Sequence, residues 1–425
     1  MKKLTLPGKI LIALISGITF GLLLSCIDST LIKQTILIDG ILKLLGTGFL
    51  NAIKLLVAPL VFVSIVYATS SLKEIKQIGR IGLKTLIFYI TTTALAIILS
   101  LIMANIINPG KGVHIDIVTT TTDAVTTSTS TNLIDTLLNM IPTNIFVAFS
   151  EGNVLGIIFF AILLGISMTL IGEKAKPLVD LFEICNDVLL QVISLIMNFA
   201  PFGIFALLAS NFATFGFTAL IPLLKYVLGT IFTLCLHLGL VYMSMLIFIG
   251  KLNPMIFLKK FMPIFSICFS TASSSAGLPL SLKTSEKQFG VSPSVCSFTL
   301  PLGATINMDG TAIMQGFAVV FVAQMYGITL GINDYIMVII TAVLASIGTA
   351  SVPGVGTVML TMVLASVNLP VDAIALLIGV DHIIDMCRTP LNVAGDHICT
   401  LLIAKSENAL DEFIYNDLKT SKQTD

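Results

Sequence analysis

Long apolar runs dominate the chain and determine most of its predicted elements. Many of these runs reach or exceed the roughly 20 residues that a helix needs to cross a bilayer. Their apolar positions are continuous and do not alternate with polar ones, which favours helices over the strands of a barrel. The pattern therefore predicts an all-α integral membrane protein with six helices in its first 250 residues, at about 10–26, 36–69, 82–108, 135–172, 178–212 and 218–250.

After residue 251 the apolar segments become shorter and turn back at polar or glycine-rich tips. The first segment, 261–272, runs into Ser273-Ser274-Ser275-Ala276-Gly277-Leu278-Pro279 and then returns to a second basic patch at 283–287. The second segment, 335–350, turns at Ser351-Val352-Pro353-Gly354-Val355-Gly356 and continues to about residue 369. A segment that enters and leaves a membrane on one side is a re-entrant hairpin, and a pair of them in corresponding positions indicates the binding site of an inverted-repeat transporter.

Each predicted hairpin precedes a full-length helix, at 292–327 and 371–405, which brings the predicted number of transmembrane helices to eight. The last helix carries a polar stripe, because five residues spaced three or four apart share a face roughly 80° wide. A charge at mid-membrane costs at least about 2.5–3.5 kcal/mol. The stripe is either a salt-bridge network between helices or a path for solute and cations. We favour the path, because three acids against one base leave negative charge for cations to neutralise. The five residues of the stripe are Asp381, Asp385, Arg388, Asn392 and Asp396.

Helix 292–327 contains a second polar group, Asn307, Asp309 and Thr311. Alternate residues scatter around a regular helix, so we expect a break at Gly310 that frees carbonyl groups and brings the side chains together. Carbonyl and carboxylate oxygens suit a small hard cation. The alternative is a kink around a satisfied buried aspartate. Exposed N–H groups at the two hairpin tips could bind a carboxylate, unless these tips are simply flexible loops.

Composition and charge narrow the class further. The chain is 56% hydrophobic and 11% charged, and its net charge of +0 gives no indication of a nucleic-acid partner. The seven cysteines form no CxxC pair and the four histidines have no metal-ligand spacing, so we interpret the cysteines as small buried hydrophobes. Lysines and arginine gather before the first helix and after the second, fourth and sixth, which predicts that both termini are cytoplasmic. The threonine-rich stretch 118–131 is predicted to be an external loop.

Four motifs carry a family resemblance, and they occur in the expected order: SSSAGLP at 273–279, PLGATINMDGT at 301–311, SIGTASVPGVG at 346–356 and DMCRTPLNVAGD at 385–396. With them the chain resembles the dicarboxylate/amino acid:cation symporters, the glutamate and aspartate transporter family, over nearly its whole length. The resemblance implies eight transmembrane helices, two hairpins, inverted repeats and an elevator-type motion in a homotrimer. It also implies a scaffold and trimerisation region in 1–250 whose third and sixth helices join the transport domain, a transport core in 251–406 and a cytoplasmic tail in 407–425.

The resemblance also implies a role for each site residue. Arg388 would pair with a substrate side-chain carboxylate and Asp385 would hold the substrate amino group. The other implied substrate contacts are Thr311, Thr389, Asn392 and the backbone of Ser274, Val352 and Gly356. Sodium ions, co-transported and not resident cofactors, would bind at three sites. The first is Asn307, Asn392, Asp396 and the Gly303 carbonyl; the second is carbonyls around Thr305, Ser346, Ile347 and Thr349; the third is Tyr89, Thr92, Thr93, Asn307 and Asp309.

These features and the resemblance predict a sodium-driven importer of glutamate or aspartate in the cell membrane, and the resemblance implies that the second hairpin is its outer gate. Some family members carry an arginine where this chain has Ala272 or Met386, which weakens the expectation of potassium counter-transport. A C4-dicarboxylate or cystine remains an alternative substrate, although Asp385 favours a substrate with an amine. Protons remain an alternative coupling ion. A passive anion channel would explain Arg388 but not the two hairpins. An enzyme is disfavoured because no nucleophile–base pair or metal-ligand set stands out.

Overall fold

The computed structural model describes residues 6–25, 31–70, 80–111, 141–151, 153–215, 220–347 and 354–417. Within these ranges the protein is almost entirely helical, and one isolated bridge between Val291 and Leu410 is its only β pairing. The predicted all-α class is therefore confirmed. Six stretches of the described residues are long and apolar enough to cross a membrane: Gly8–Ser25, Leu37–Tyr67, Arg80–Ile107, Gly156–Met197, Leu220–Phe248 and Pro293–Met325.

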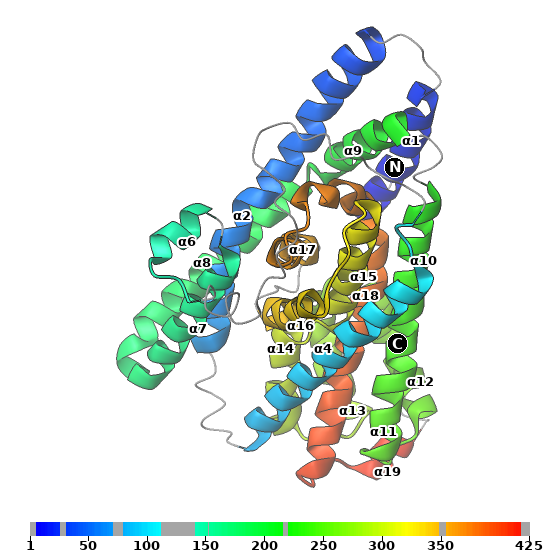
Figure 1. Cartoon of the computed structure of the whole chain (residues 1–425). Coiled ribbons are helices and arrows are strands. Elements are labelled where there is room, and N and C mark those ends of the chain that lie inside the picture. The colour runs from blue at the N-terminus through cyan, green and yellow to red at the C-terminus, as the bar shows by residue number, and fades with distance from the viewer. Residues whose placement is uncertain are drawn as a thin grey trace, which may run out of the picture.

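The helices of the first 250 residues follow the predicted apolar runs, but two runs are interrupted (Figure 1). Run 178–212 is divided at Asn198–Phe199, where Pro201 lacks the N–H that a continuous helix needs. Run 135–172 is divided before Asn153, whose side chain caps the next helix. The elements are α1 Leu6–Ser25, η1 Leu31–Leu42, α2 Lys43–Ser70, α4 Arg80–Ile107, α6 Ile145–Glu151, α7 Val154–Ile171, η2 Gly172–Ala175, α8 Lys176–Met197, α9 Ala200–Phe215, α10 Leu220–His237, η4 Leu238–Met243 and α11 Ser244–Phe248.

The remaining residues form two helical hairpins, a broken helix and one long helix. The elements are α12 Pro254–Thr271, α13 Ser274–Lys287, α14 Pro293–Ile306, α15 Asp309–Met325, α16 Ile332–Ile347, α17 Val355–Ser366, η5 Val371–Ala373, α18 Ile374–Ser406 and α19 Glu412–Asn416. Helices α12 and α13 pack against each other and against α18, and we call this pair hairpin 1. Helices α16 and α17 also pack together, and we call them hairpin 2.

The tip of hairpin 1 is shorter than predicted. The chain turns at Ala272, which adopts the left-handed conformation (φ 49°), and at Ser273. The Ser273 side chain accepts a hydrogen bond from the N–H of Ala276 and so begins α13 at the next residue. The serines and glycine that follow are therefore helical, and the turn is shorter than the predicted tip at 273–279. The tip of hairpin 2, residues 348–353, lies outside the described residues.

The helix break between α14 and α15 also differs from its predicted place. Asn307 and Met308 are the non-helical residues, whereas Gly310 lies in the first turn of α15. The break therefore lies two to three residues before Gly310, where it was expected, and that expectation was wrong. Asn307 leaves the helix because its side-chain amide donates to the Asn392 carbonyl and to Asp396 of α18, 2.9 Å in each case. The break thus depends on a partner far away in the sequence.

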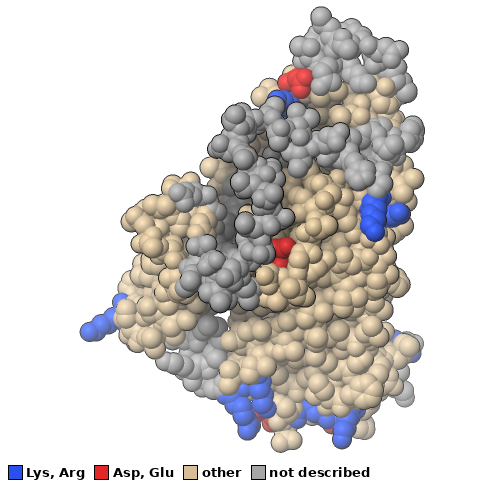
Figure 2. All heavy atoms as spheres, viewed as in Figure 1, with Lys and Arg blue, Asp and Glu red and all other residues tan. Residues whose placement is uncertain are grey.

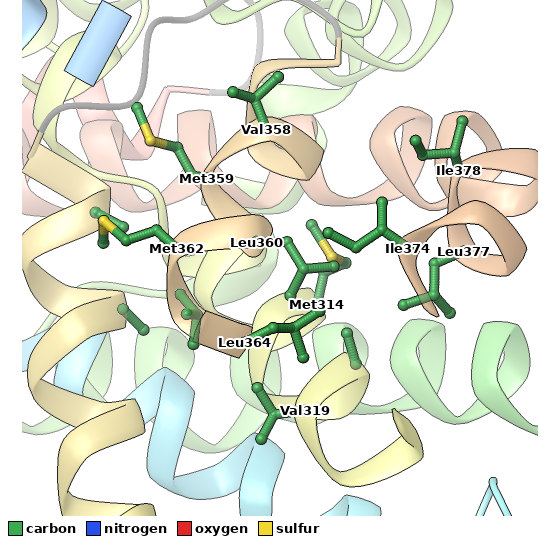
Figure 3. Packing of buried hydrophobic residues seen from close by; sticks show 14 of the residues in the cluster. Met314, Val319, Val358, Met359, Leu360, Met362, Leu364, Ile374, Leu377 and Ile378 are labelled. Carbon is green, nitrogen blue, oxygen red and sulfur yellow. The ribbon is translucent and has the colours of Figure 1, made fainter. Parts of the chain in front are cut away.

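Helix α18 lies inside the C-terminal half and contacts α4, α10, α12, α14 and α15. Its apolar side chains Ile374 and Leu377 belong to one buried cluster with Met314 of α15 and Leu360 and Leu364 of α17 (Figure 3). The early helices pack mainly among themselves, α1 on α9 and α2 on α7 and α8. On the face seen in Figure 2, most of the basic side chains gather at the end of the molecule that holds α19, and few charged side chains lie between the two ends.

Candidate functional site

The polar stripe of α18 is buried, and Arg388 lies at its centre. Its Nε donates to Oδ1 of Asp385 at 3.0 Å, and its Nη1 donates to Oδ1 of Asp381 at 3.2 Å. Arg388 is 2% exposed and the two aspartates 5% and 7%. Buried charges persist only when they are paired and hydrogen-bonded. The i, i+3 and i, i+7 spacing on one helix supplies both partners, so the helix presents a compact group of one cation and two carboxylates.

Hairpin 2 closes over this charged group. The N–H of Gly354 donates to Oδ2 of Asp385 at 3.2 Å, and the Thr357 hydroxyl donates to Oδ2 of Asp381. A Cβ on Gly356 would lie 2.8–2.9 Å from the Arg388 guanidinium, closer than real Cβ atoms come. Glycine at 356 therefore lets the backbone of α17 lie directly on the guanidinium. Such an arrangement can bind a carboxylate through the fork of Arg388 and an ammonium through Asp385.

Thr389 completes the group, because its hydroxyl donates to the same Asp385 oxygen that accepts from Arg388, at 3.1 Å. One oxygen of Asp385 thus accepts from two side chains of its own helix, and the other accepts from the hairpin 2 backbone. Asp385, like Asp381, therefore joins α18 to hairpin 2 by a hydrogen bond.

A second polar group surrounds Asn307 at the break between α14 and α15. Besides its two bonds to α18, its main-chain N–H donates to the Gly303 carbonyl at 2.8 Å. A Cβ on Gly303 would lie 2.4 Å from Oδ1 of Asp396. Oδ1 of Asn307 is buried and has no hydrogen-bond partner among the described residues. Buried carbonyl oxygens normally have partners. A free amide oxygen beside a carboxylate is a donor set that suits a small hard cation.

Asn392 links this group to α15. Its Oδ1 accepts from the N–H of Gly310 at 2.7 Å, and its Nδ2 lies 3.3 Å from the sulfur of Met308. The predicted pair of Asn307 and Asp309 is divided between two groups. Asn307 faces α18, whereas Asp309 faces α4 and α10.

Asp309 is fully buried and accepts hydrogen bonds from three elements. Thr93 of α4 donates at 2.6 Å, Tyr242 of η4 at 2.7 Å, and Nε2 of His237 lies at 3.3 Å. A Cβ on Gly395 would lie 2.1 Å from the Tyr242 hydroxyl and 2.5 Å from Nδ2 of Asn307, so the Asn307 and Asp309 groups adjoin at α18. Sequence reasoning missed Tyr242 and His237. The signal was an ionisable side chain within an apolar run, which by itself suggests a functional site.

The other predicted site residues make more local contacts. The Tyr89 hydroxyl donates to the Thr299 carbonyl at 3.0 Å and Thr92 donates to the Tyr89 carbonyl, so neither side chain is bonded to Asp309. Thr305 and Ser346 bond within their own helices, α14 and α16, which contact each other; Ile347 ends α16. Thr311 and Ser274 are buried. Thr349 and Val352 lie outside the described residues.

Comparisons of the sequence with known proteins identify its family. The profile of the sodium:dicarboxylate symporter family matches residues 6–406. The chain is 36% identical to the proton/glutamate-aspartate symporter of Escherichia coli, over 96% of this chain and 94% of that protein. It is 34% identical to a proton/sodium-glutamate symport protein of Bacillus caldotenax, over 97% of each chain. It is also 32% identical to a C4-dicarboxylate transport protein of Brucella anthropi, over 87% of this chain and 84% of that protein. The chain belongs to the sodium:dicarboxylate symporter family, whose members are multi-pass membrane transporters.

Proposed function

We propose that this protein imports glutamate or aspartate together with sodium ions. The observation that carries the proposal is the buried pair of Arg388 and Asp385 beneath hairpin 2. An acidic amino acid carries a carboxylate for the guanidinium and an ammonium for the aspartate, so both charges of the pair gain a partner. The substrate contacts would be completed by Thr389, Thr311, Asn392 and the backbone at Ser274, Val352 and Gly356.

The cations would bind in the groups around Asn307 and Asp309. The free amide oxygen of Asn307 beside Asp396, with the Gly303 carbonyl, supports the first site. The contact of Thr93 with Asp309 supports another, to which Tyr89, Thr92 and Asn307 would add ligands. The third, from carbonyls at Thr305, Ser346, Ile347 and Thr349, is supported by the contact of α14 with α16. No resident cofactor enters this scheme.

Movement of one part of the molecule against the other would carry substrate and cations across the membrane. Helices α4 and α10 pack on α15 and α18, while α1, α2, α7, α8 and α9 pack mainly on one another, which supports an elevator-type motion of 251–406 with α4 and α10. We place hairpin 2 as the outer gate, both termini in the cytoplasm and the protein in a homotrimer. Clustering of basic residues at the α19 end supports this orientation.

Coupling follows if hairpin 2 closes fully only over a loaded site. A ligand shifts an equilibrium only by its differential affinity for the two states. The Gly354–Asp385 bond joins the gate to the residue proposed to hold the substrate ammonium, so substrate binding and gate position affect the same carboxylate.

Proton coupling is the second candidate, because the relatives from E. coli and B. caldotenax carry proton in their names. A C4-dicarboxylate is an alternative substrate, because the relative from Brucella anthropi is named as a C4-dicarboxylate transport protein. A dicarboxylate has no ammonium, however, and would leave Asp385 facing a second negative charge.

Uptake by purified protein in lipid vesicles tests the proposal. Labelled aspartate, glutamate, cystine and succinate are offered under an inward sodium gradient or an inward proton gradient. We expect aspartate or glutamate to accumulate with sodium only, Arg388→Ala to abolish uptake, and Arg80→Ala to retain it, because the second arginine of the chain lies at the surface. Preference for succinate or cystine would refute the substrate assignment, and accumulation driven by protons alone would refute sodium coupling.

A further inference from the structure

The C-terminal segment 409–416 lies against both ends of hairpin 1, and we call it the strap. The Ser292 N–H donates to the Ala409 carbonyl at 3.0 Å, and the Asp411 N–H donates to the Gly290 carbonyl at 2.8 Å. Gly290 adopts φ +74°, and a Cβ there would lie 2.5 Å from the Asp411 carbonyl oxygen. The strap is therefore joined through its backbone to the chain that leaves α13.

Tyr415 joins the strap to the other end of the hairpin. Its side chain is fully buried, and its hydroxyl donates to the carbonyl of Asn253, the residue that caps α12, at 2.9 Å. The start of α12 and the end of α13 are thus both held by one short segment. Phe413 on the same helix is 85% exposed, so the burial of Tyr415 is specific to its position.

Lys260 of α12 lies at the centre of this contact. Its Nζ donates to three main-chain carbonyls, those of Gln288 at 2.7 Å and of Ile414 and Tyr415 at 2.9 Å each. The side chain is 1% exposed. An ammonium has three N–H donors, and all three have an acceptor here. Because a buried ammonium without acceptors is costly, the strap and the end of α13 are required for this lysine to be buried.

A chain of rings connects the strap to α18 beside the proposed cation ligands. Phe289 stacks on Tyr415 with centroids 6.1 Å apart and meets His397 edge-on at 5.5 Å. Nδ1 of His397 is 2.9 Å from the Ser285 hydroxyl of α13. His397 directly follows Asp396. The packing that orders hairpin 1 is therefore continuous with the helix turn that presents the Asp396 carboxylate.

We propose that Lys260 is a positioning residue. The strap, and the cage of carbonyls from Gln288, Ile414 and Tyr415 around Lys260, hold hairpin 1 against α18 and so fix the geometry of the proposed cation site at Asp396. The transport consequence rests on the proposed function. The structural consequence does not rest on the proposed function, because it concerns how well hairpin 1 is protected from hydrogen–deuterium exchange in the protein without substrate. A shortened side chain at 260 should leave a cage that accepts a small primary ammonium ion.

The test compares Lys260→Ala with Lys259→Ala in the full-length purified protein, since Lys259 is the exposed neighbour on the same helix. Hydrogen–deuterium exchange is measured on peptides covering 254–292. We expect exchange to rise by roughly tenfold or more in Lys260→Ala only, because charge-assisted bonds are lost. Added n-propylammonium should restore protection, and n-propanol of the same size should not. Exchange equal to that of Lys259→Ala, or equal rescue by n-propanol, would overturn the proposal.

Two further measurements keep the test decisive. If Lys260→Ala does not fold, Tyr415→Phe is tested in its place, because it removes only the hydroxyl that bonds the Asn253 carbonyl. Unchanged hydrogen–deuterium exchange at the start of α12 in this variant would overturn the proposal. In vesicles, Lys260→Ala should raise the sodium concentration for half-maximal uptake above that of Lys259→Ala, and n-propylammonium should lower it again; no shift would overturn the link to Asp396. If the wild-type protein shows no sodium-driven uptake, the proposed function fails while the exchange result still decides the role of the strap.

Discussion

The Thr357 hydroxyl of α17 donates a hydrogen bond to Asp381 of α18, the same carboxylate that accepts from the guanidinium of Arg388. Hairpin 2 is thereby joined to Arg388 through Asp381, a residue that is not among the proposed substrate contacts. If hairpin 2 moves away as the proposed gate, Asp381 loses this donor and keeps the guanidinium as its hydrogen-bond partner. On that proposal, the position of hairpin 2 and the charge balance around Arg388 are physically linked.

Replacing Thr357 with valine removes this donor while nearly preserving shape. One hydrogen bond to a charged group contributes about 1.5–3 kcal/mol, so we expect the substrate KM to rise roughly tenfold with a smaller change in maximal rate. Thr361→Val is the matched control, because Thr361 is buried one turn later on α17 and bonds only the Val358 carbonyl. Uptake kinetics in vesicles provide the measurement, and equal KM values for the two variants would refute the role of Asp381 in gating.

Gly356→Ala should displace either Arg388 or α17. The added Cβ would lie within 3.0 Å of three guanidinium atoms. Because the guanidinium is held by two carboxylates and the site is buried, we expect uptake to fall by roughly tenfold to a hundredfold while the fold is retained. Gly48→Ala serves as control, since a Cβ there has nothing within 4 Å. Substrate binding by calorimetry separates a binding defect from an expression defect, and wild-type affinity in Gly356→Ala would contradict the packing seen here.

The sequence predicted the features that depend on local pattern. Continuous apolar runs indicated helices, and the spacing of Asp381 to Asp396 indicated one buried stripe, because both follow from the helical period alone. Features that depend on distant partners could not be predicted. The helix breaks at Asn307 because of acceptors on α18. The early start of α13, by contrast, comes from the local cap of Ser273 on Ala276. No local signal places Tyr242 beside Asp309, and Thr93 was grouped with Asp309 only through the family resemblance, since these residues come from different helices.

Tyr242→Phe should weaken cation binding at Asp309 without changing the packing around it. The variant removes one of the donors that hold Asp309 and leaves the ring in place. A misoriented carboxylate binds a cation less well, so we expect the sodium concentration for half-maximal uptake to rise by about threefold to tenfold, with little effect on substrate KM at saturating sodium. Tyr335→Phe is the control, because its hydroxyl bonds Asn105 away from the site. An unchanged sodium dependence would exclude Asp309 as a cation ligand oriented by Tyr242.

Glu407, just after α18, should make the attachment of α4 to α18 depend on pH. Arg80 donates to it through Nε at 3.0 Å and through Nη2, and Lys84 donates at 2.6 Å. The hydrogen bond from Arg80, followed by that from Lys84, lowers the pKa of Glu407 from 4.5 to about 2. A carboxyl whose pKa is lowered in the folded state contributes stability that is complete above its unfolded pKa and is lost as the pH falls through the folded value. The contribution should therefore be present at pH 7 and decline between pH 4.5 and about 2.

Thermal unfolding of the detergent-solubilised protein provides the measurement for Glu407→Gln. We expect the variant to unfold at a lower temperature than wild type at pH 7, and the difference to narrow progressively below pH 4.5. The difference should also shrink in high salt, because Arg80 is largely exposed and its charge is screened. Glu286→Gln is the control, since Glu286 pairs only with its neighbour Lys287 on the same helix and joins no two elements. A difference that persists unchanged down to pH 2 would mean that Glu407 stabilises the helix ends by packing and not by its charge.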